Sequence, residues 1–109
     1  MSYIRLKDGD NYLYPEMYGI DTTNVIATIT NKSDTYTAIQ DCYIAGYIAS
    51  STGDRQIGLL IDGVLISSGY SSAALRIGIN IFVKKNQVIT LSGTANTPNL
   101  TIYGLKYHS

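Results

Sequence analysis

Charged residues are scarce in this 109-residue chain. Lys, Arg, Asp and Glu make up 15% of it, against roughly 25% in an average domain. The eight basic and eight acidic residues cancel, so the sequence offers no basic patch for nucleic acid and no polybasic run for a membrane surface. No apolar run reaches the roughly 18 residues of a membrane-spanning helix. Neither a nucleic-acid partner nor membrane insertion is expected.

Cysteine is almost absent as well. The single cysteine, Cys42, excludes an intramolecular disulfide. Its apolar neighbours Tyr43 and Ile44 predict a buried small hydrophobe rather than a reactive thiol. The first residues, MSYIRLKDGDNY, carry charges where a signal peptide needs an apolar segment. Export through the Sec pathway is therefore not expected.

Residues that carry catalysis or bind metals are few. The only histidine, His108, is the penultimate residue, and there is a single glutamate. The stretch Asp8-Gly9-Asp10-Asn11 resembles the start of a calcium loop, but Tyr12 stands at the next ligand position and no Glu ends the pattern. No zinc spacing and no phosphate-binding loop occurs. We therefore expect no enzyme, no metal and no cofactor. A pair of opposed carboxylates, as in glycosidases, stays open among Glu16, Asp21, Asp34, Asp41, Asp54 and Asp62.

Strand-forming residues recur between clusters of Gly, Asn, Asp and Ser, and no segment keeps a helical period. The segment LRIGINIFV (75–83) alternates apolar and other residues almost without exception. Asp62-Gly63, between two apolar triplets, predicts a hairpin with a type I′ turn. The other expected strands cover residues 3–6, 11–14, 25–30, 35–40, 42–50, 88–92 and 99–106. The side chains expected to point inward are Ile44, Ile48, Ile57, Leu59, Ile61, Leu75, Ile77, Ile79, Ile81, Ile89, Leu91, Leu100 and Ile102.

These strands predict an all-β fold, an antiparallel jelly-roll β-sandwich. We expect a short N-terminal lead-in with a possible β-hairpin over residues 1–24 and the sandwich head domain over residues 25–109. The outward faces of several strands carry small and aromatic residues instead of charges. Such a face favours contact with another subunit, and closed rotational symmetry is the usual arrangement. The expected interface residues are Phe82, Tyr43, Tyr47 and Tyr103.

The second half of the chain resembles a known family in the order of its segments. AIQDCYIAGYIA is followed by LLIDGVLI, then by FVKKNQVITLSG, then by NLTIYGLK. This order, over residues 35–106, resembles the C-terminal jelly-roll heads of phage tail fibre and receptor-binding proteins, which share their shape with tumour necrosis factor and C1q heads. The resemblance implies a homotrimer on a virion appendage, assembled in the host cytoplasm, that recognises a host-surface saccharide or protein without catalysis.

The loops are the expected location of ligand binding. An aromatic face beside hydrogen-bonding groups suits a saccharide, and loop residues of this kind are Tyr70, Arg55, Asp54, Gln56 and Asn96. Two other functions stay open. The chain can be a purely structural trimerising or decoration module of a virion, or a monomeric carbohydrate-binding module of a bacterial protein.

Overall fold

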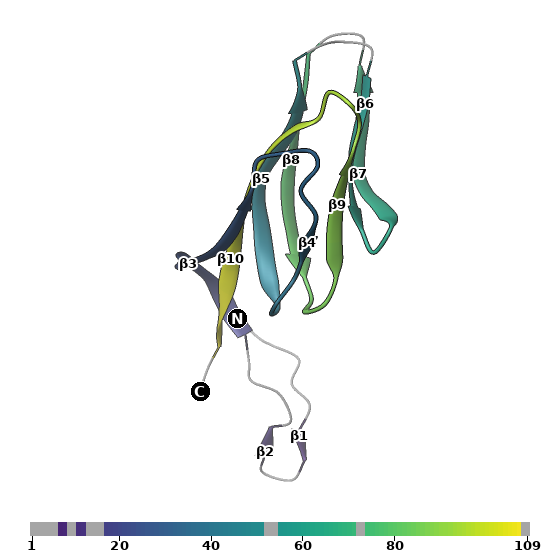
Figure 1. Cartoon of the computed structure of the whole chain (residues 1–109). Coiled ribbons are helices and arrows are strands. Elements are labelled where there is room, and N and C mark those ends of the chain that lie inside the picture. Colours follow the sequence, from purple (N-terminus) through teal and green to yellow (C-terminus); the bar gives the residue numbers. More distant parts are fainter. Residues whose placement is uncertain (1–6, 9–10, 13–16, 52–54, 72–73, 108–109) are drawn as a thin grey trace.

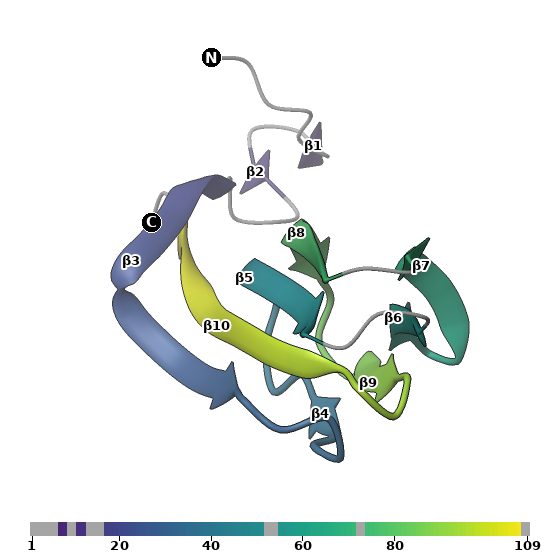
Figure 2. The same ribbon diagram turned by 90° about the horizontal axis from the view of Figure 1, so that it is seen from above.

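The computed structural model describes residues 7–8, 11–12, 17–51, 55–71 and 74–107, and it is all-β over these ranges (Figure 1). Two four-stranded antiparallel sheets face each other as two layers (Figure 2). The prediction of an antiparallel sandwich is therefore confirmed. Because the described residues form no helix, they include none that could cross a membrane.

We call the two layers sheet I and sheet II, and apart from one hairpin in sheet II the neighbouring strands in each are far apart in the sequence. In spatial order, sheet I contains β3 (Met17–Ile29), β10 (Thr97–Tyr107), β5 (Cys42–Ser50) and β8 (Leu75–Val83). Sheet II contains β4 (Tyr36–Thr37), β9 (Val88–Ser92), β6 (Arg55–Ile61) and β7 (Val64–Ser71). Two further strands, β1 (Lys7–Asp8) and β2 (Asn11–Tyr12), pair with each other at the place of the expected N-terminal hairpin.

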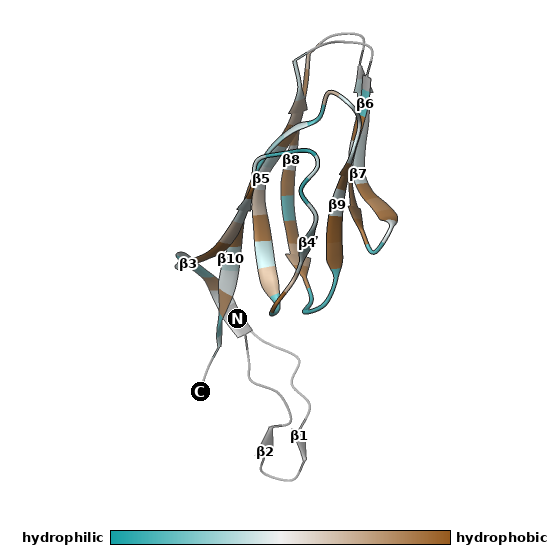
Figure 3. Ribbon diagram, in the orientation of Figure 1, coloured by the Kyte–Doolittle hydropathy of each residue, from teal (hydrophilic) through white to brown (hydrophobic). Residues whose placement is uncertain are grey.

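The core lies between the sheets and consists mainly of branched aliphatic side chains. Along β5, Cys42, Ile44 and Ile48 are fully buried, while the intervening Tyr43 and Tyr47 are half-buried on the outer side. The same alternation is visible along β8 as successive hydrophobic and hydrophilic residues (Figure 3). All side chains predicted to point inward are buried or packed against this core. Full burial of one such side chain contributes roughly 1.5–3 kcal/mol, so the alternation fixes which face of each strand is outside.

Two turns at one end of the sandwich are fixed by residues with positive φ. Asp62 and Gly63 have φ of 51° and 77°, as a type I′ turn requires, so the predicted β6–β7 turn is confirmed. The Asp62 carboxylate also accepts a hydrogen bond from Val88 N at 2.8 Å, which connects this turn to β9. We call this end, with the β6–β7 and β8–β9 turns, the lower end. The upper end holds the β3–β4 and β9–β10 loops (Figure 1).

Strand β3 differs from the prediction, because it begins at Met17 instead of Val25. Its first half mixes apolar and polar residues without regular alternation. β3 is an edge strand, and its side chains are exposed or half-buried from residue 19 to residue 25. Backbone pairing with β10 keeps this half extended through several register shifts. The expected boundary between residues 24 and 25 therefore falls inside a strand.

Candidate functional site

The outer face of sheet I is arranged in rows, because residues in register on neighbouring strands point to the same side. The row nearest the lower end joins Val25, Tyr103, Tyr43 and Phe82 across all four strands. We call these four residues the aromatic row. The rows that follow toward the upper end contain Thr101, Ala45 and Asn80, then Asn99, Tyr47 and Gly78, then Thr97, Ala49 and Arg76. Arg76 is the only charged residue in these four rows.

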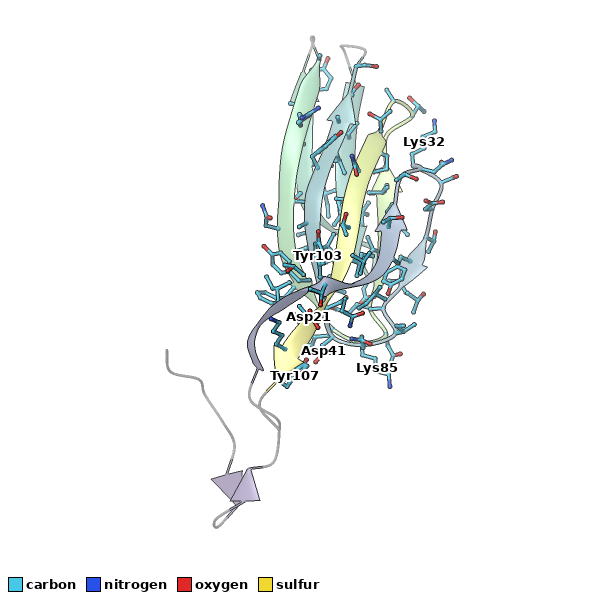
Figure 4. All side chains as sticks on the ribbon, turned by 90° about the vertical axis from the view of Figure 1, so that its left-hand side faces the viewer. Asp21, Lys32, Asp41, Lys85, Tyr103 and Tyr107 are labelled. Atoms are coloured by element: carbon cyan, nitrogen blue, oxygen red, sulfur yellow. The ribbon has the colours of Figure 1, made fainter. Side chains whose placement is uncertain are left out.

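The aromatic row is held by a ring contact and remains open to solvent. The rings of Tyr43 and Phe82 meet edge to face, with centroids 4.9 Å apart and planes at 65°. Tyr43 Oη donates to Asn80 Oδ1 at 3.3 Å, which positions the first ring. Phe82 and Val25 are still 56% and 52% exposed. Figure 4 looks at this face and shows Tyr103 toward the lower end of the molecule. The row therefore presents an apolar strip with few hydrogen-bonding groups.

Tyr47 lies on the same strand as Tyr43 but has a different environment. The Arg76 guanidinium lies over the Tyr47 ring, with its Cζ 4.1 Å from the ring centroid. Arg76 reaches the ring diagonally, because Gly78 is directly opposite Tyr47 and has no side chain to cover it. A Cβ added at Gly78 would meet nothing within 4 Å. Asn99 Nδ2 donates to Tyr47 Oη at 3.4 Å, so the phenol keeps its own proton for another acceptor.

Two hollows at the upper end adjoin this pair. The first has a volume of about 420 Å³ and is lined by Tyr47, Ala49, Ser50, Ser51, Ala74, Leu75, Arg76 and Thr97. The second has a volume of about 410 Å³ and is lined by Thr30, Asn31, Lys32, Ser51, Thr94, Ala95, Asn96 and Thr97. We call them the Arg76 hollow and the Lys32 hollow. They share Ser51 and Thr97 in their linings, and we call the two neighbouring hollows together the depression; Ser, Thr and Asn side chains lie in its lining among a larger share of apolar surface.

The β3–β4 loop brings Lys32 to this depression. Asn31 Oδ1 accepts hydrogen bonds from Ser33 N at 3.0 Å and from Ser33 Oγ at 2.8 Å, an arrangement that fixes a tight turn. Asp34 Oδ2 accepts from Asn31 N at 3.3 Å, which closes the loop. Lys32 Nζ then donates to the Thr94 carbonyl on the β9–β10 loop. The two loops are therefore tied together across the Lys32 hollow.

Asn96 holds the β9–β10 loop against sheet II. Its side chain is 2% exposed, and Nδ2 donates to Ser92 O at 2.9 Å and to Gly58 O at 3.2 Å. Its Oδ1 is buried and has no hydrogen-bond partner among the described residues. The Asn96 Nδ2 group is therefore paired inside the sandwich, at the buried side of the Lys32 hollow lining.

The structure separates the expected ligand-binding residues. Tyr70, 63% exposed, is in register with Gln56 on sheet II, while Asn96 lies in the buried position just described. Asp54 and the side chain of Arg55 lie outside the described residues. Of the expected interface residues, Tyr43, Phe82 and Tyr103 come together in the aromatic row, and Tyr47 lies apart under Arg76. The sequence reasoning missed Arg76, Lys32 and Thr97, although a lone Arg on an otherwise uncharged strand face was a usable signal.

The described residues offer little for metal binding or nucleophilic chemistry. They contain no group of three or more His, Cys, Asp or Glu side chains placed to hold a metal ion. The buried thiol of Cys42 has a raised pKa, first because of burial and then because of the nearby Asp41 carboxylate. A raised pKa reduces the thiolate fraction at neutral pH. His108 lies outside the described residues.

Comparison with known proteins gives no relative on which to base a function. No protein-family model matches the sequence, and no curated protein matches it.

Proposed function

We propose that this chain is a receptor-binding head of a phage tail or similar virion appendage. In this proposal it is a jelly roll without catalytic activity that assembles as a homotrimer in the host cytoplasm and recognises a host-surface saccharide or protein. The outer face of sheet I carries the proposal. That face has one charged residue, Arg76, in its four central rows and an aromatic row across all its strands.

The strand order supports a jelly roll, in which eight strands form two Greek keys. Along the chain, β3, β4 and β5 alternate between sheet I and sheet II. Strands β6 and β7 then form a hairpin within sheet II, and β8, β9 and β10 alternate again (Figure 1). The order in which the eight strands enter the two sheets is therefore the same when read from either end of the chain.

The composition of the aromatic row supports self-association. A sheet face that remains in water normally carries polar and charged side chains, whereas Phe82 and Val25 are more than half exposed here. Tyr and Phe are enriched at the centres of protein interfaces, and charged residues are depleted there. A second copy of the chain offers the same apolar strip, so closed symmetry buries the row in every subunit. The proposal of three subunits rests on the resemblance of the sequence to phage tail heads.

Light scattering of the purified protein at micromolar and nanomolar concentrations tests the assembly. We expect three chain masses at micromolar concentration. Phe82→Lys, at an exposed position, is expected to weaken association about 30-fold or more, because it places a charge in the buried centre of the interface. Ile39→Lys is the matched control, since Ile39 is 65% exposed and lies outside the aromatic row. A monomer at both concentrations would overturn the trimer and favour a monomeric carbohydrate-binding module.

Recognition is tested separately with an array of bacterial surface glycans and with intact bacterial cells. Specific, saturable binding without cleavage of the glycan supports a recognition head. A trimer that binds no glycan and no cell would point to the second candidate, a structural module of a virion. The exposed Val64, Leu65 and Ile66 at the β6–β7 hairpin favour that candidate, because they form an apolar tip suited to contact with another protein.

A further inference from the structure

Among the residues that the structure describes, the two cations of the upper depression have no acidic partner. Arg76 and Lys32 are the charged residues in the linings of the two hollows, and no described carboxylate lines either hollow. Arg76 contacts the ring of Tyr47, and Lys32 donates to the backbone oxygen of Thr94. Both contacts fix the position of a positive charge without neutralising it. The described lining of the depression is therefore positive, and it adjoins sheet rows in which Arg76 is the one charged residue.

Stacking on Tyr47 leaves the edge of the Arg76 guanidinium available. A guanidinium presents five N–H donors in one plane, and this fork matches the two oxygens of a carboxylate or a phosphate. The Arg76 Cζ lies over the Tyr47 ring, and a cation–π contact does not require the N–H donors to be paired with an acceptor atom. Tyr47 therefore acts as a positioning residue for Arg76. The Asn99 amide positions Tyr47 in turn, through the hydrogen bond to its Oη.

Neutral polar groups surround the two charges. Thr97 Oγ1 donates to Ala49 O at 2.9 Å, so its lone pairs can accept hydrogen bonds from a ligand. Ser51 is exposed where the two hollows meet. Ligands with hydroxyl groups bind to such side chains well, because each hydroxyl can both donate and accept a hydrogen bond. Cationic donors such as Arg76, next to the hydroxyl groups of Thr97 and Ser51, suit a sugar that carries a negative charge.

We propose that the depression binds an anionic saccharide, with Arg76 in bidentate contact with a carboxylate or phosphate of the sugar and Lys32 as a second cation. The inference rests on the proposed recognition function and specifies its ligand class. A uronic acid and a phosphodiester-linked glycan offer the same oxyanion chemistry, so the test includes both. The two neighbouring hollows have similar volumes and share Ser51 and Thr97, an arrangement that suits adjacent sugar units of one chain.

Calorimetry with matched probes tests this inference. The probes are a galacturonic acid oligomer, its methyl ester, which is neutral, and a glycerol phosphate oligomer. We expect binding to at least one anionic probe and a loss of about tenfold or more for the methyl ester. Arg76→Gln is expected to weaken binding by about tenfold or more, since it removes a charge-assisted bidentate contact. Arg76→Lys is expected to restore part of the loss, because it keeps the charge without the planar fork.

Lys85→Gln is the control, because it removes the same charge at the lower end of the molecule (Figure 4). Its affinity for the anionic probe is expected to equal that of the unchanged protein. Equal affinity for the galacturonate and its methyl ester, or equal affinity before and after Arg76→Gln, would overturn the anionic site. If neutral glycans bind and anionic probes do not, the inference fails and the recognition function stands. If no saccharide of any kind binds, the inference fails, and binding to intact bacterial cells then decides whether the recognition function stands.

Discussion

Tyr43 and Tyr47 are four residues apart on strand β5 and point to the same outer face, yet their surroundings differ. Tyr43 meets the ring of Phe82 edge to face, while Tyr47 lies under the guanidinium of Arg76. The residue directly opposite decides this difference. Phe82 is opposite Tyr43, and Gly78 is opposite Tyr47. One strand therefore has an apolar lower part suited to protein contact and a positive upper part suited to an anionic ligand.

The inner face of β5 also changes from apolar at the lower end to polar at the upper end. Cys42 is buried beside the aromatic row, and Ser50 is buried beside the Arg76 hollow. A polar hydroxyl is tolerated in the core where the sandwich meets its upper end. At the lower end this face of β5 is apolar as far as Cys42, the first residue of the strand. The two parts of the face thus differ through the whole thickness of sheet I.

The largest expected effect is a loss of stability on substitution of Gly46, which lies between Tyr43 and Tyr47 on β5. Gly46 has φ of +141°, and a Cβ there would lie 2.0 Å from the backbone oxygen of Asn99 on β10. Gly46→Ala is therefore expected to lower the free energy of unfolding by about 3 kcal/mol or more, through backbone strain and displacement of β10. Urea denaturation measures this. Gly78→Ala is the control, because its Cβ meets nothing within 4 Å; an equal loss for both variants would contradict the prediction.

A pair of substitutions separates the two parts of the face. Tyr43→Ser is expected to weaken self-association about tenfold or more, since it removes an interface aromatic, and to leave binding of the galacturonate oligomer unchanged. Tyr47→Ser is expected to do the reverse, because it frees the Arg76 side chain from its stacked position. Sedimentation velocity and calorimetry measure the two properties. If either substitution changes both properties equally, the face acts as a single site and the comparison fails.

The lower part of this face was largely predictable from the sequence, and the upper part was not. Alternation and flanking turn residues predicted the bounds of β5, β8 and β9 and the outward direction of Tyr43 and Phe82, and the Asp-Gly pair predicted the turn at Asp62-Gly63. The Tyr47–Arg76 contact depends on the register between β5 and β8, which the sequence does not specify by itself. The start of β3 was missed because an edge strand needs no apolar alternation. Lys32 was missed because its position depends on the Asn31 turn.

Salt concentration is expected to have a smaller effect, which differs between ligand binding at the depression and self-association through the aromatic row. Raising NaCl from about 0.05 M to about 0.5 M is expected to weaken binding of the anionic probe several-fold, because screening acts on exposed charges such as those in the depression. Association through the aromatic row is expected to stay the same or to strengthen slightly, since the row contains no charged residue. Calorimetry and light scattering across the same salt series provide the measurement. Salt-driven dissociation of the oligomer would show that charges outside the row control assembly.

The smallest expected effect is the pH dependence contributed by Cys42. Its folded pKa is raised above the ordinary value of 9.0 by burial and by Asp41. Below that pH the thiol is protonated in both folded and unfolded chains. Above it the unfolded chain loses the proton first, so the free energy of unfolding falls as pH rises from 9.0 toward the folded pKa. Cys42→Ala is expected to reduce this fall by up to about 1 kcal/mol.

Urea denaturation at pH 8 and pH 10 measures the Cys42 contribution, and the slopes with pH are compared instead of the absolute stabilities. Cys42→Ala removes a buried side chain and so lowers stability at every pH, but this loss cancels in the slope. Burial also raises the pKa of Tyr36 and Tyr107, so the substitution is expected to reduce the slope without abolishing it. Identical slopes with and without the thiol would mean that water reaches Cys42, and that the core beneath the aromatic row is not dry.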